Sequence, residues 1–308
     1  SFILASAALG GCGVAVDRAA SAREAAAEAA FPPMGQFVEV MGTRVHAVVR
    51  GRGPDLVLIH GASGSTRDFT FDLVEPLSRS FRVIAFDRPG LGYSEDLGER
   101  GLSPLVQADV LRAAAAQLGV RRPIVLGHRY GGAVAMAWAL RDPGGPRGLV
   151  IVSGATMPWP GGLGPWYAIS SSRFGGATVV PLIAAYAPLS RADDAVAAIF
   201  APEAAPKGYA DYIGAGLSLR RDPLRTNARQ VNALKAHLLA MEQNYDKLAV
   251  PVEILHGLAD TIVPADVHAV PLSKRLPNAR LTLIEGAGHM PHHTRSDTVI
   301  AAIRRLAR

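Results

Sequence analysis

The stretch Ile124-Val125-Leu126-Gly127-His128-Arg129-Tyr130-Gly131-Gly132 decides the fold of this 308-residue chain. It opens with a short, continuously apolar run, which is typical of a parallel strand buried on both faces. Glycines then flank a tight turn, and a predicted helix follows over residues 133–140. The sequence therefore predicts a buried strand that turns directly into a helix, with Arg129 at the centre of the turn.

Apolar runs of the same kind recur on both sides of this stretch. They occupy residues 56–59, 83–86, 149–152, 252–255 and 281–284, and further predicted helices cover residues 105–118, 265–276 and 298–306. Such alternation predicts an α/β fold with a mostly parallel central sheet and helices on both of its faces. Earlier in the chain, residues 37–40 and 43–49 flank Met41-Gly42, which predicts a hairpin with one exposed face.

About a hundred residues separate the runs that end at Val152 and begin at Val252, where a crossover normally needs one helix. This insertion contains predicted helical pieces at residues 192–200 and 226–242, broken by glycine and proline, and it is rich in aromatic residues. We expect it to form a helical cap over the carboxyl edge of the sheet, where open α/β sheets place their ligands. The predicted parts are a core of residues 35–155 and 247–308, a cap of residues 156–246 and an N-terminal segment of residues 1–34.

The composition excludes several classes of protein. Hydrophobic residues make up 49% of the chain and charged residues 19%, which suits a globular core and excludes a disordered chain or a coiled coil. The formal net charge is +6, but the basic residues are scattered and all but four are arginine, so no nucleic-acid partner is expected. No stretch reaches the roughly 18 uninterrupted apolar residues of a membrane span.

The N-terminal segment has features of an export signal. Residues 2–16 form an apolar run of small residues that contains Leu9-Gly10-Gly11-Cys12, and this run resembles the lipobox of a bacterial lipoprotein. On this interpretation the chain is exported and a lipid on Cys12 tethers it to a membrane. The alternative is an Ala-rich helix with an incidental thiol in a cytoplasmic protein. In either case we expect residues 17–34 to form a tether.

Four more loops follow predicted strands and carry distinctive residues. They are His60-Gly61-Ala62-Ser63-Gly64-Ser65, Phe86-Asp87-Arg88-Pro89-Gly90-Leu91-Gly92-Tyr93-Ser94, His256-Gly257-Leu258-Ala259-Asp260-Thr261-Ile262-Val263-Pro264 and Gly286-Ala287-Gly288-His289-Met290-Pro291. With the turn at Arg129, they resemble the α/β-hydrolase superfamily, in particular serine esterases and lipases, over about residues 37–306. In that superfamily the turn is a nucleophile elbow with the sequence G-x-S-x-G, so Arg129 stands where serine is expected.

The resemblance implies a role for each of five positions. Arg129 occupies the nucleophile position, Asp260 that of the triad acid and His289 that of the general base, in the superfamily's chain order. The backbone N–H groups of Ala62 and Tyr130 would form an oxyanion hole. His60 is expected to be structural, and turn or lining roles are expected for Ser63, Ser65, Ser94 and Ser153.

No metal or organic cofactor is expected. Cys12 is the one cysteine, which excludes an intramolecular disulfide and a multi-cysteine metal site. His289, His292 and His293 are close in sequence, but no carboxylate or cysteine completes a metal-ligand spacing with them. The chain also has no Gly-rich phosphate loop or dinucleotide fingerprint. The expected partner is a small-molecule, mainly apolar ester.

Arg129 limits what such a site can do. A guanidinium stays protonated and is a poor nucleophile, so His289 has no proton to take from it and no covalent intermediate forms. Loss of the serine of a triad lowers kcat by about 10⁶, which predicts a chain nearly inactive toward esters and amides. The Arg129 cation is also expected to reach toward His289 and Asp260 and to lower the pKa of His289.

Three functional accounts follow from these residues. The first is a serine-hydrolase scaffold whose nucleophile has been replaced. The second is a ligand-binding protein on the same scaffold, in which Arg129 holds a carboxylate or phosphate. The third is lyase-like chemistry with His289 as the base and Arg129 as an electrostatic clamp. The intact acid and base positions favour the first account.

Overall fold

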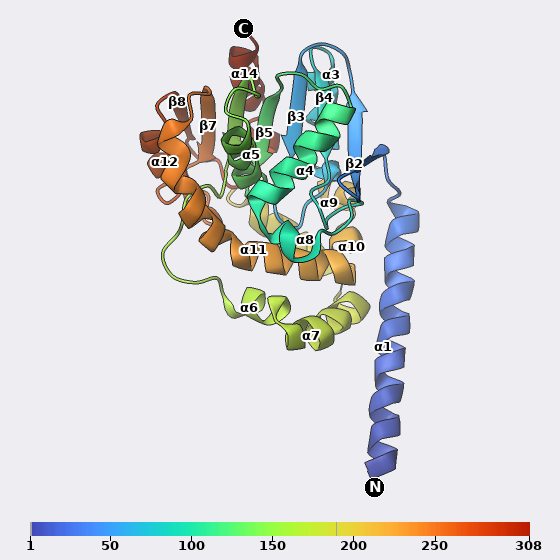
Figure 1. The fold of residues 1–308 in the computed structure, drawn as a ribbon. Helices are drawn as coiled ribbons and strands as arrows, with labels where there is room; N and C mark the ends of the chain where they lie inside the picture. Colours follow the sequence, from blue (N-terminus) through green and yellow to red (C-terminus); the bar gives the residue numbers. More distant parts are fainter. Residues whose placement is uncertain (1, 189) are drawn as a thin grey trace.

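An eight-stranded sheet forms the centre of the molecule in the computed structural model (Figure 1). The structure describes the backbone of residues 2–188 and 190–308, and the side chains of residues 13–308 except 166 and 189. The strand order is β1-β2-β4-β3-β5-β6-β7-β8, with β2 antiparallel to both of its neighbours and all other pairs parallel. The predicted α/β fold with a mostly parallel sheet is confirmed.

Each predicted apolar run forms a strand. Met41 and Gly42 join the first two strands with φ angles of 51° and 74°, the backbone of a two-residue hairpin turn. The last strand differs from the expectation of burial on both faces: it is the edge strand, and none of its residues is fully buried. The strands are β1 (Gln36–Val40), β2 (Thr43–Arg50), β3 (Asp55–Ile59), β4 (Arg82–Phe86), β5 (Ile124–His128), β6 (Gly148–Val152), β7 (Val252–Gly257) and β8 (Ala279–Ile284).

Helices cover both faces of the sheet, because successive side chains of each buried strand point to opposite sides. Val57 and Ile59 pack in one core with α4 (Pro104–Gln117), α5 (Tyr130–Arg141) and α12 (Ala269–Arg275). Leu56 and Leu58 pack in a second core with α3 (Val74–Ser78) and α14 (Ser296–Ala307). Short helices at loops complete the core: α2 (Thr66–Thr70), η1 (Gly98–Leu102) and α13 (Pro291–Thr294).

The chain between β6 and β7 is helical. Figure 1 shows α6, α7 and α11 at the end of the sheet away from the C-terminus. Residues of α8, α9 and α10 share a cavity with the loops that follow β3, β5 and β8, so this cap lies over the carboxyl edge of the sheet. Its helices are α6 (Pro165–Ser171), α7 (Arg173–Tyr186), α8 (Ser190–Phe200), α9 (Tyr209–Ile213), α10 (Ala215–Ser218), α11 (Arg221–Met241) and η2 (Glu242–Lys247).

The N-terminal helix α1 (Phe2–Ala30) extends along the cap, as Figure 1 shows. The part of residues 17–34 up to Ala30, which was expected to be a tether, is helical and packs against α7 and α10. Ion pairs hold it there: Arg221 contacts Asp17 and Glu24, and Arg220 contacts Glu28. The cap is therefore fixed to the chain that precedes the sheet as well as to the sheet.

Two expectations about the N-terminus concern membranes. Among the helices that the structure describes, none combines the length and the apolar composition needed to cross a bilayer. The side chain of Cys12 lies outside the described residues, so lipid attachment at this position stays a prediction.

Candidate active site

The turn between β5 and α5 holds Arg129 in an unusual backbone conformation, with φ 51° and ψ −117°. The flanking glycines are required by close packing. A Cβ atom on Gly127 would lie 2.1 Å from the carbonyl oxygen of Gly131, and one on Gly131 would lie 2.0 Å from that of Ile59. Because no side chain fits at either position, the turn stays tight and presents Arg129 at the carboxyl edge of the sheet, where it lines a cavity.

Asp260 and His289 are brought together beside this turn. Asp260 follows β7 and His289 follows β8, two neighbouring parallel strands whose carboxyl ends lie at one edge. Nδ1 of His289 donates a 2.8 Å hydrogen bond to Oδ2 of Asp260, and Nε2 is buried without a hydrogen-bond partner. The bond places the proton on Nδ1 and leaves the lone pair of the neutral ring on Nε2.

Burial and hydrogen bonding set the charges of this pair. Burial alone would raise the pKa of Asp260, but hydrogen bonds from His256 and His289 outweigh it and hold the pKa well below its usual value. Burial lowers the pKa of His289, the bond to Asp260 opposes this effect, and the positive charge of Arg129 lowers the pKa further. At neutral pH the pair is therefore a carboxylate and a neutral imidazole, and the imidazole can accept a proton at Nε2.

Arg129 does not form the expected ion pair with Asp260. The carboxylate of Asp260 is occupied by His289 and by the backbone N–H groups of Ile262 and Val263, each at 2.9 Å. Within the described part of the chain, the Arg129 guanidinium makes no hydrogen bond or ion pair, and the side chain is half-buried against the cavity. The expected effect of Arg129 on the pKa of His289 is thus present without a direct contact to the acid.

Two backbone N–H groups also face this region. Tyr130 begins α5, so its N–H has no partner inside the helix. Arg88 orients the peptide before Ala62, because its Nη2 donates a 3.2 Å hydrogen bond to the carbonyl oxygen of Gly61. The N–H and C=O of a trans peptide point in opposite directions, so the N–H of Ala62 points away from Arg88, and Ala62 lines the cavity.

Arg88 is fully buried and has no carboxylate partner among the described residues. Its guanidinium donates to the carbonyl of His60 and to the side-chain oxygens of Gln107 and Gln230, and it lies 4.1 Å from the ring centre of Tyr130. Burial lowers the pKa of Arg88 to about 10, so it remains charged at neutral pH. This one side chain therefore connects the loop after β3, the start of α5 and cap helix α11.

A cavity of about 380 Å³ lies between these loops and the cap. Residues 61–65, His128, Arg129 and His289 line its floor, and cap residues form its walls. The cap contributes mainly alanine, valine, isoleucine and leucine side chains, together with Tyr167 and Tyr209. Arg129 is thus a cation at the floor of a mainly apolar cavity.

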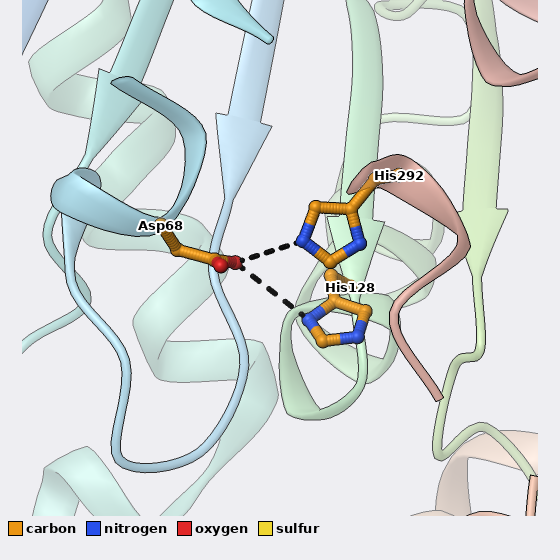
Figure 2. Close-up of side chains that lie close together, drawn as sticks. All are labelled: Asp68, His128 and His292. Carbon is orange, nitrogen blue, oxygen red and sulfur yellow. Dashed lines mark hydrogen bonds and ion pairs between the residues drawn. The ribbon is translucent and has the colours of Figure 1, made fainter. Parts of the chain in front are cut away.

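A buried cluster of one carboxylate and three imidazoles lies beside the cavity. Figure 2 shows Asp68, His128 and His292 of this cluster. Asp68 accepts hydrogen bonds from Nε2 of His292 at 3.1 Å, from Nε2 of His293 at 3.0 Å and from the hydroxyl of Tyr209 at 2.7 Å. Nδ1 of His128 lies 3.9 Å from the same carboxylate. Asp68 of α2 thus joins histidines that have no carboxylate at a metal-ligand spacing in the sequence, because it lies 224 residues before His292.

The protonation states of the three histidines set the net charge of this described cluster. Burial lowers the pKa of His293, but hydrogen bonds to Asp68 and Asp72 outweigh it and raise the pKa to about 9. Burial lowers the pKa of His292 and of His128, which are therefore neutral. Asp68, His128 and His292 offer three possible metal ligands within 4.8 Å of one another. The Asp68 carboxylate, however, already accepts three hydrogen bonds, so its charge is compensated without a metal ion.

The sequence matches the model of a known family over most of its length. The description of that family is "alpha/beta hydrolase fold", and the match covers residues 54–296, from the start of β3 to the start of α14. The chain belongs to the α/β-hydrolase fold family. The resemblance stated from the loops is confirmed.

Relatives of this α/β hydrolase include esterases and other hydrolases. It is 26% identical over 269 residues to a 2-hydroxymuconate semialdehyde hydrolase of Pseudomonas putida, covering 84% of this chain and 88% of that protein. It is 28% identical over 273 residues to a pimeloyl-[acyl-carrier protein] methyl ester esterase of Nitrosomonas europaea, covering 80% and 93%. Its fold resembles the crystal structure of the esterase RhEst1 from Rhodococcus sp. ECU1013, with a TM-score of 0.67, 24% identity and coverage of 88% and 97%.

The structure of this α/β hydrolase adds residues that sequence reasoning missed. They are Asp68, Asn227 and Arg88, of which only Arg88 lies in one of the distinctive loops of the sequence. Asn227 of α11 accepts a 2.7 Å hydrogen bond from the backbone N–H of Ser63 and donates to its hydroxyl at 3.0 Å, which fixes the loop after β3 to the cap. No local pattern marks these residues, because each acts on a segment far away in the chain.

Proposed function

We propose that this chain is a scaffold for carboxylic ester hydrolysis, in which Asp260 and His289 are the acid and base of a serine triad and Arg129 occupies the position of the nucleophile. The observation that carries the proposal is the buried Nε2 of His289. It has no partner, its ring is oriented by Asp260, and it shares the cavity floor with Arg129. A general base that is positioned to accept the proton of a hydroxyl has this arrangement.

The chemistry follows with serine at position 129. Nε2 of His289 would take the proton of the hydroxyl while the oxygen attacks the acyl carbon, and Asp260 would stabilise the imidazolium. The N–H groups of Ala62 and Tyr130 would hold the negative oxygen of the tetrahedral intermediate. The proton on Nε2 would then pass to the departing alkoxide, and water would repeat the sequence on the acyl-enzyme.

With Arg129 in place, the first proton transfer has no donor, because the guanidinium does not give up its proton at neutral pH. The chain as it stands is therefore an impaired hydrolase. The substrate class is a small, mainly apolar ester. The apolar cavity walls support an apolar substrate, and the similarity to a pimeloyl-[acyl-carrier protein] methyl ester esterase supports an ester.

The test compares the native chain with Arg129→Ser on a short p-nitrophenyl ester, with the double variant Arg129→Ser, His289→Ala as the control. We expect the serine variant to be active, and the native chain and the double variant to be slower by up to about 10⁶. A fluorophosphonate probe should label the serine variant with one molecule per chain and leave the native chain unlabelled. A silent, unlabelled and folded serine variant would refute the proposal.

We also propose that the chain is exported and held at a membrane by a lipid on Cys12. The apolar run of residues 2–16 that precedes and surrounds this cysteine supports the proposal. Incorporation of labelled palmitate into the native chain in a bacterial host, and its loss in Cys12→Ser, would support lipid attachment. Equal labelling of both chains, or no labelling of either, would contradict it.

A further inference from the structure

Arg129 is a cation without a counter-ion in the described structure. The two buried carboxylates of this region are both engaged: Asp68 accepts three hydrogen bonds from the histidine cluster and Tyr209, and Asp260 is bonded to His289 and to two backbone N–H groups. A half-buried guanidinium on an apolar cavity is costly unless an anion pairs with it. An anion that pairs with Arg129 would therefore come from outside the chain.

The surroundings of Arg129 favour such an anion. Arg129 immediately precedes α5, a helix of 12 residues whose N-terminal end carries partial positive charge. The N–H groups of Tyr130 and Ala62 lie beside it without partners in the described structure. His289, which is 2% exposed, presents its unpartnered Nε2 to the same cavity. This nitrogen is an acceptor on the neutral ring and becomes a donor to an anion when the ring takes up a proton. Several hydrogen-bonding atoms thus converge on one place at the cavity floor.

The rest of the cavity selects for an apolar tail. The apolar part of the cavity wall includes Val196 and Ile199 of α8, Ile213 of α9, Leu219 and Leu224. Among the described residues that line the cavity, the other arginine is Arg191, an exposed residue of α8. A ligand that fits both the cation at the cavity floor and the apolar wall carries one negative charge at one end and a hydrocarbon chain at the other.

We propose that the native chain binds one molecule of an unbranched aliphatic carboxylate, such as a medium-chain fatty acid. The carboxylate pairs with the guanidinium of Arg129, and the hydrocarbon chain lies along α8. A planar carboxylate matches the paired N–H groups of one guanidinium and its single charge, whereas a doubly charged phosphate would need a second cation at the floor. The inference rests on the proposed function, since this acid is the acyl half of the ester that the scaffold would hydrolyse.

The experiment is calorimetric titration of the native chain with decanoate, decanol and decyl phosphate. We expect decanoate to bind with one molecule per chain and to be the tightest of the three. Across hexanoate, octanoate and decanoate, each added methylene should tighten binding about fourfold until the cavity is filled. Arg129→Ser and Arg129→Gln should weaken decanoate binding about ten- to hundredfold. Arg52→Ser is the control, because Arg52 is an exposed arginine between β2 and β3 that does not line the cavity, and it should leave decanoate binding unchanged.

Several outcomes would overturn the inference. Equal affinity of the native chain and the two Arg129 variants for decanoate would show that the cation does not hold the carboxylate. Tighter binding of decyl phosphate would assign the site to another anion. Equal binding of decanol and decanoate would show that only the apolar wall contributes to the affinity. An active Arg129→Ser with no decanoate binding to the native chain refutes this inference alone. Arg129-dependent binding with an inactive serine variant refutes the proposed function alone.

Discussion

Nε2 of His128 donates a 3.1 Å hydrogen bond to the backbone carbonyl oxygen of His289. The side chain that precedes Arg129 is therefore bonded directly to the main chain of the residue that carries the unpartnered imidazole. Because His128 is the last residue of β5, the bond fixes the loop after β8 to the rigid centre of the sheet. This contact therefore helps to set the separation of positions 129 and 289.

Breaking this contact should misplace His289. In an active Arg129→Ser background, His128→Ala is expected to lower kcat by about tenfold to a hundredfold with little change in KM, since small displacements of a catalytic group cost about this much. His128→Gln, which retains a donor, should restore part of the rate. Steady-state kinetics on a p-nitrophenyl ester checks both variants, and an unchanged kcat for His128→Ala would contradict the prediction.

Asp260 should matter for rate more than for binding. Asp260→Asn in the Arg129→Ser background is expected to lower kcat by about 10⁴, because the amide favours the wrong tautomer of His289. Asp246→Asn, an exposed carboxylate on η2, is the control and should leave the rate unchanged. A loss of less than tenfold for Asp260→Asn would show that this residue is not the acid.

Arg129 should be measurable in the titration of His289. Its positive charge disfavours the imidazolium, so Arg129→Ser is expected to raise the pKa of His289 relative to the native chain. The pKa is read from the ring carbon and proton shifts of His289 by NMR. Arg191→Ser, which removes a cation from the cavity wall and leaves the turn intact, should have a smaller effect. An unchanged or lowered pKa in Arg129→Ser would rule out the like-charge effect.

His293 should make the stability of the native chain depend on alkaline pH. Its pKa in the folded chain is about 9, above the ordinary value of 6.5, so protonation favours folding. This contribution is fully present below pH 6.5 and is lost as the pH rises through 9. Urea unfolding from pH 6 to pH 9.5 should show a decline in the free energy of unfolding, and the decline should be smaller in His293→Gln.

Asp68 should be essential to the stability of the same cluster. Asp68→Ala leaves His293 with one carboxylate partner and removes the acceptor of His292 and Tyr209, so we expect the free energy of unfolding to fall by about 3 to 5 kcal/mol. Asp246→Asn again serves as an exposed control. Urea unfolding at pH 7 checks the difference, and a loss below about 1 kcal/mol would show that the cluster contributes little.

The strand–turn–helix unit at Arg129 could be predicted from the sequence because its causes are local. Glycines at positions 127 and 131 are required by contacts within or beside the unit itself. The same is true of the hairpin at Met41-Gly42 and of the buried strands. The exposure of β8 could not be predicted, since an apolar run at the edge of a sheet has the same sequence pattern as one at its centre.

The missing parts of the site depend on contacts between distant segments. Asp68 lies 224 residues before His292, and its position is decided by the order of the strands rather than by spacing. The packing of α1 against the cap could not be predicted for a related reason. The Ala- and Glu-rich sequence of α1 does not indicate that Arg220, which precedes α11, and Arg221, the first residue of α11, form ion pairs with it.

The left-handed backbone at Arg129 has a further consequence, for evolution rather than catalysis. A non-glycine residue in such a conformation destabilises the native fold by about 1 to 3 kcal/mol. A nucleophile at this position would offset that cost through catalysis, but arginine cannot act as a nucleophile. Arg129→Gly would relieve that burden in a single step. If related chains keep arginine at this position, selection must act on a function of the guanidinium itself.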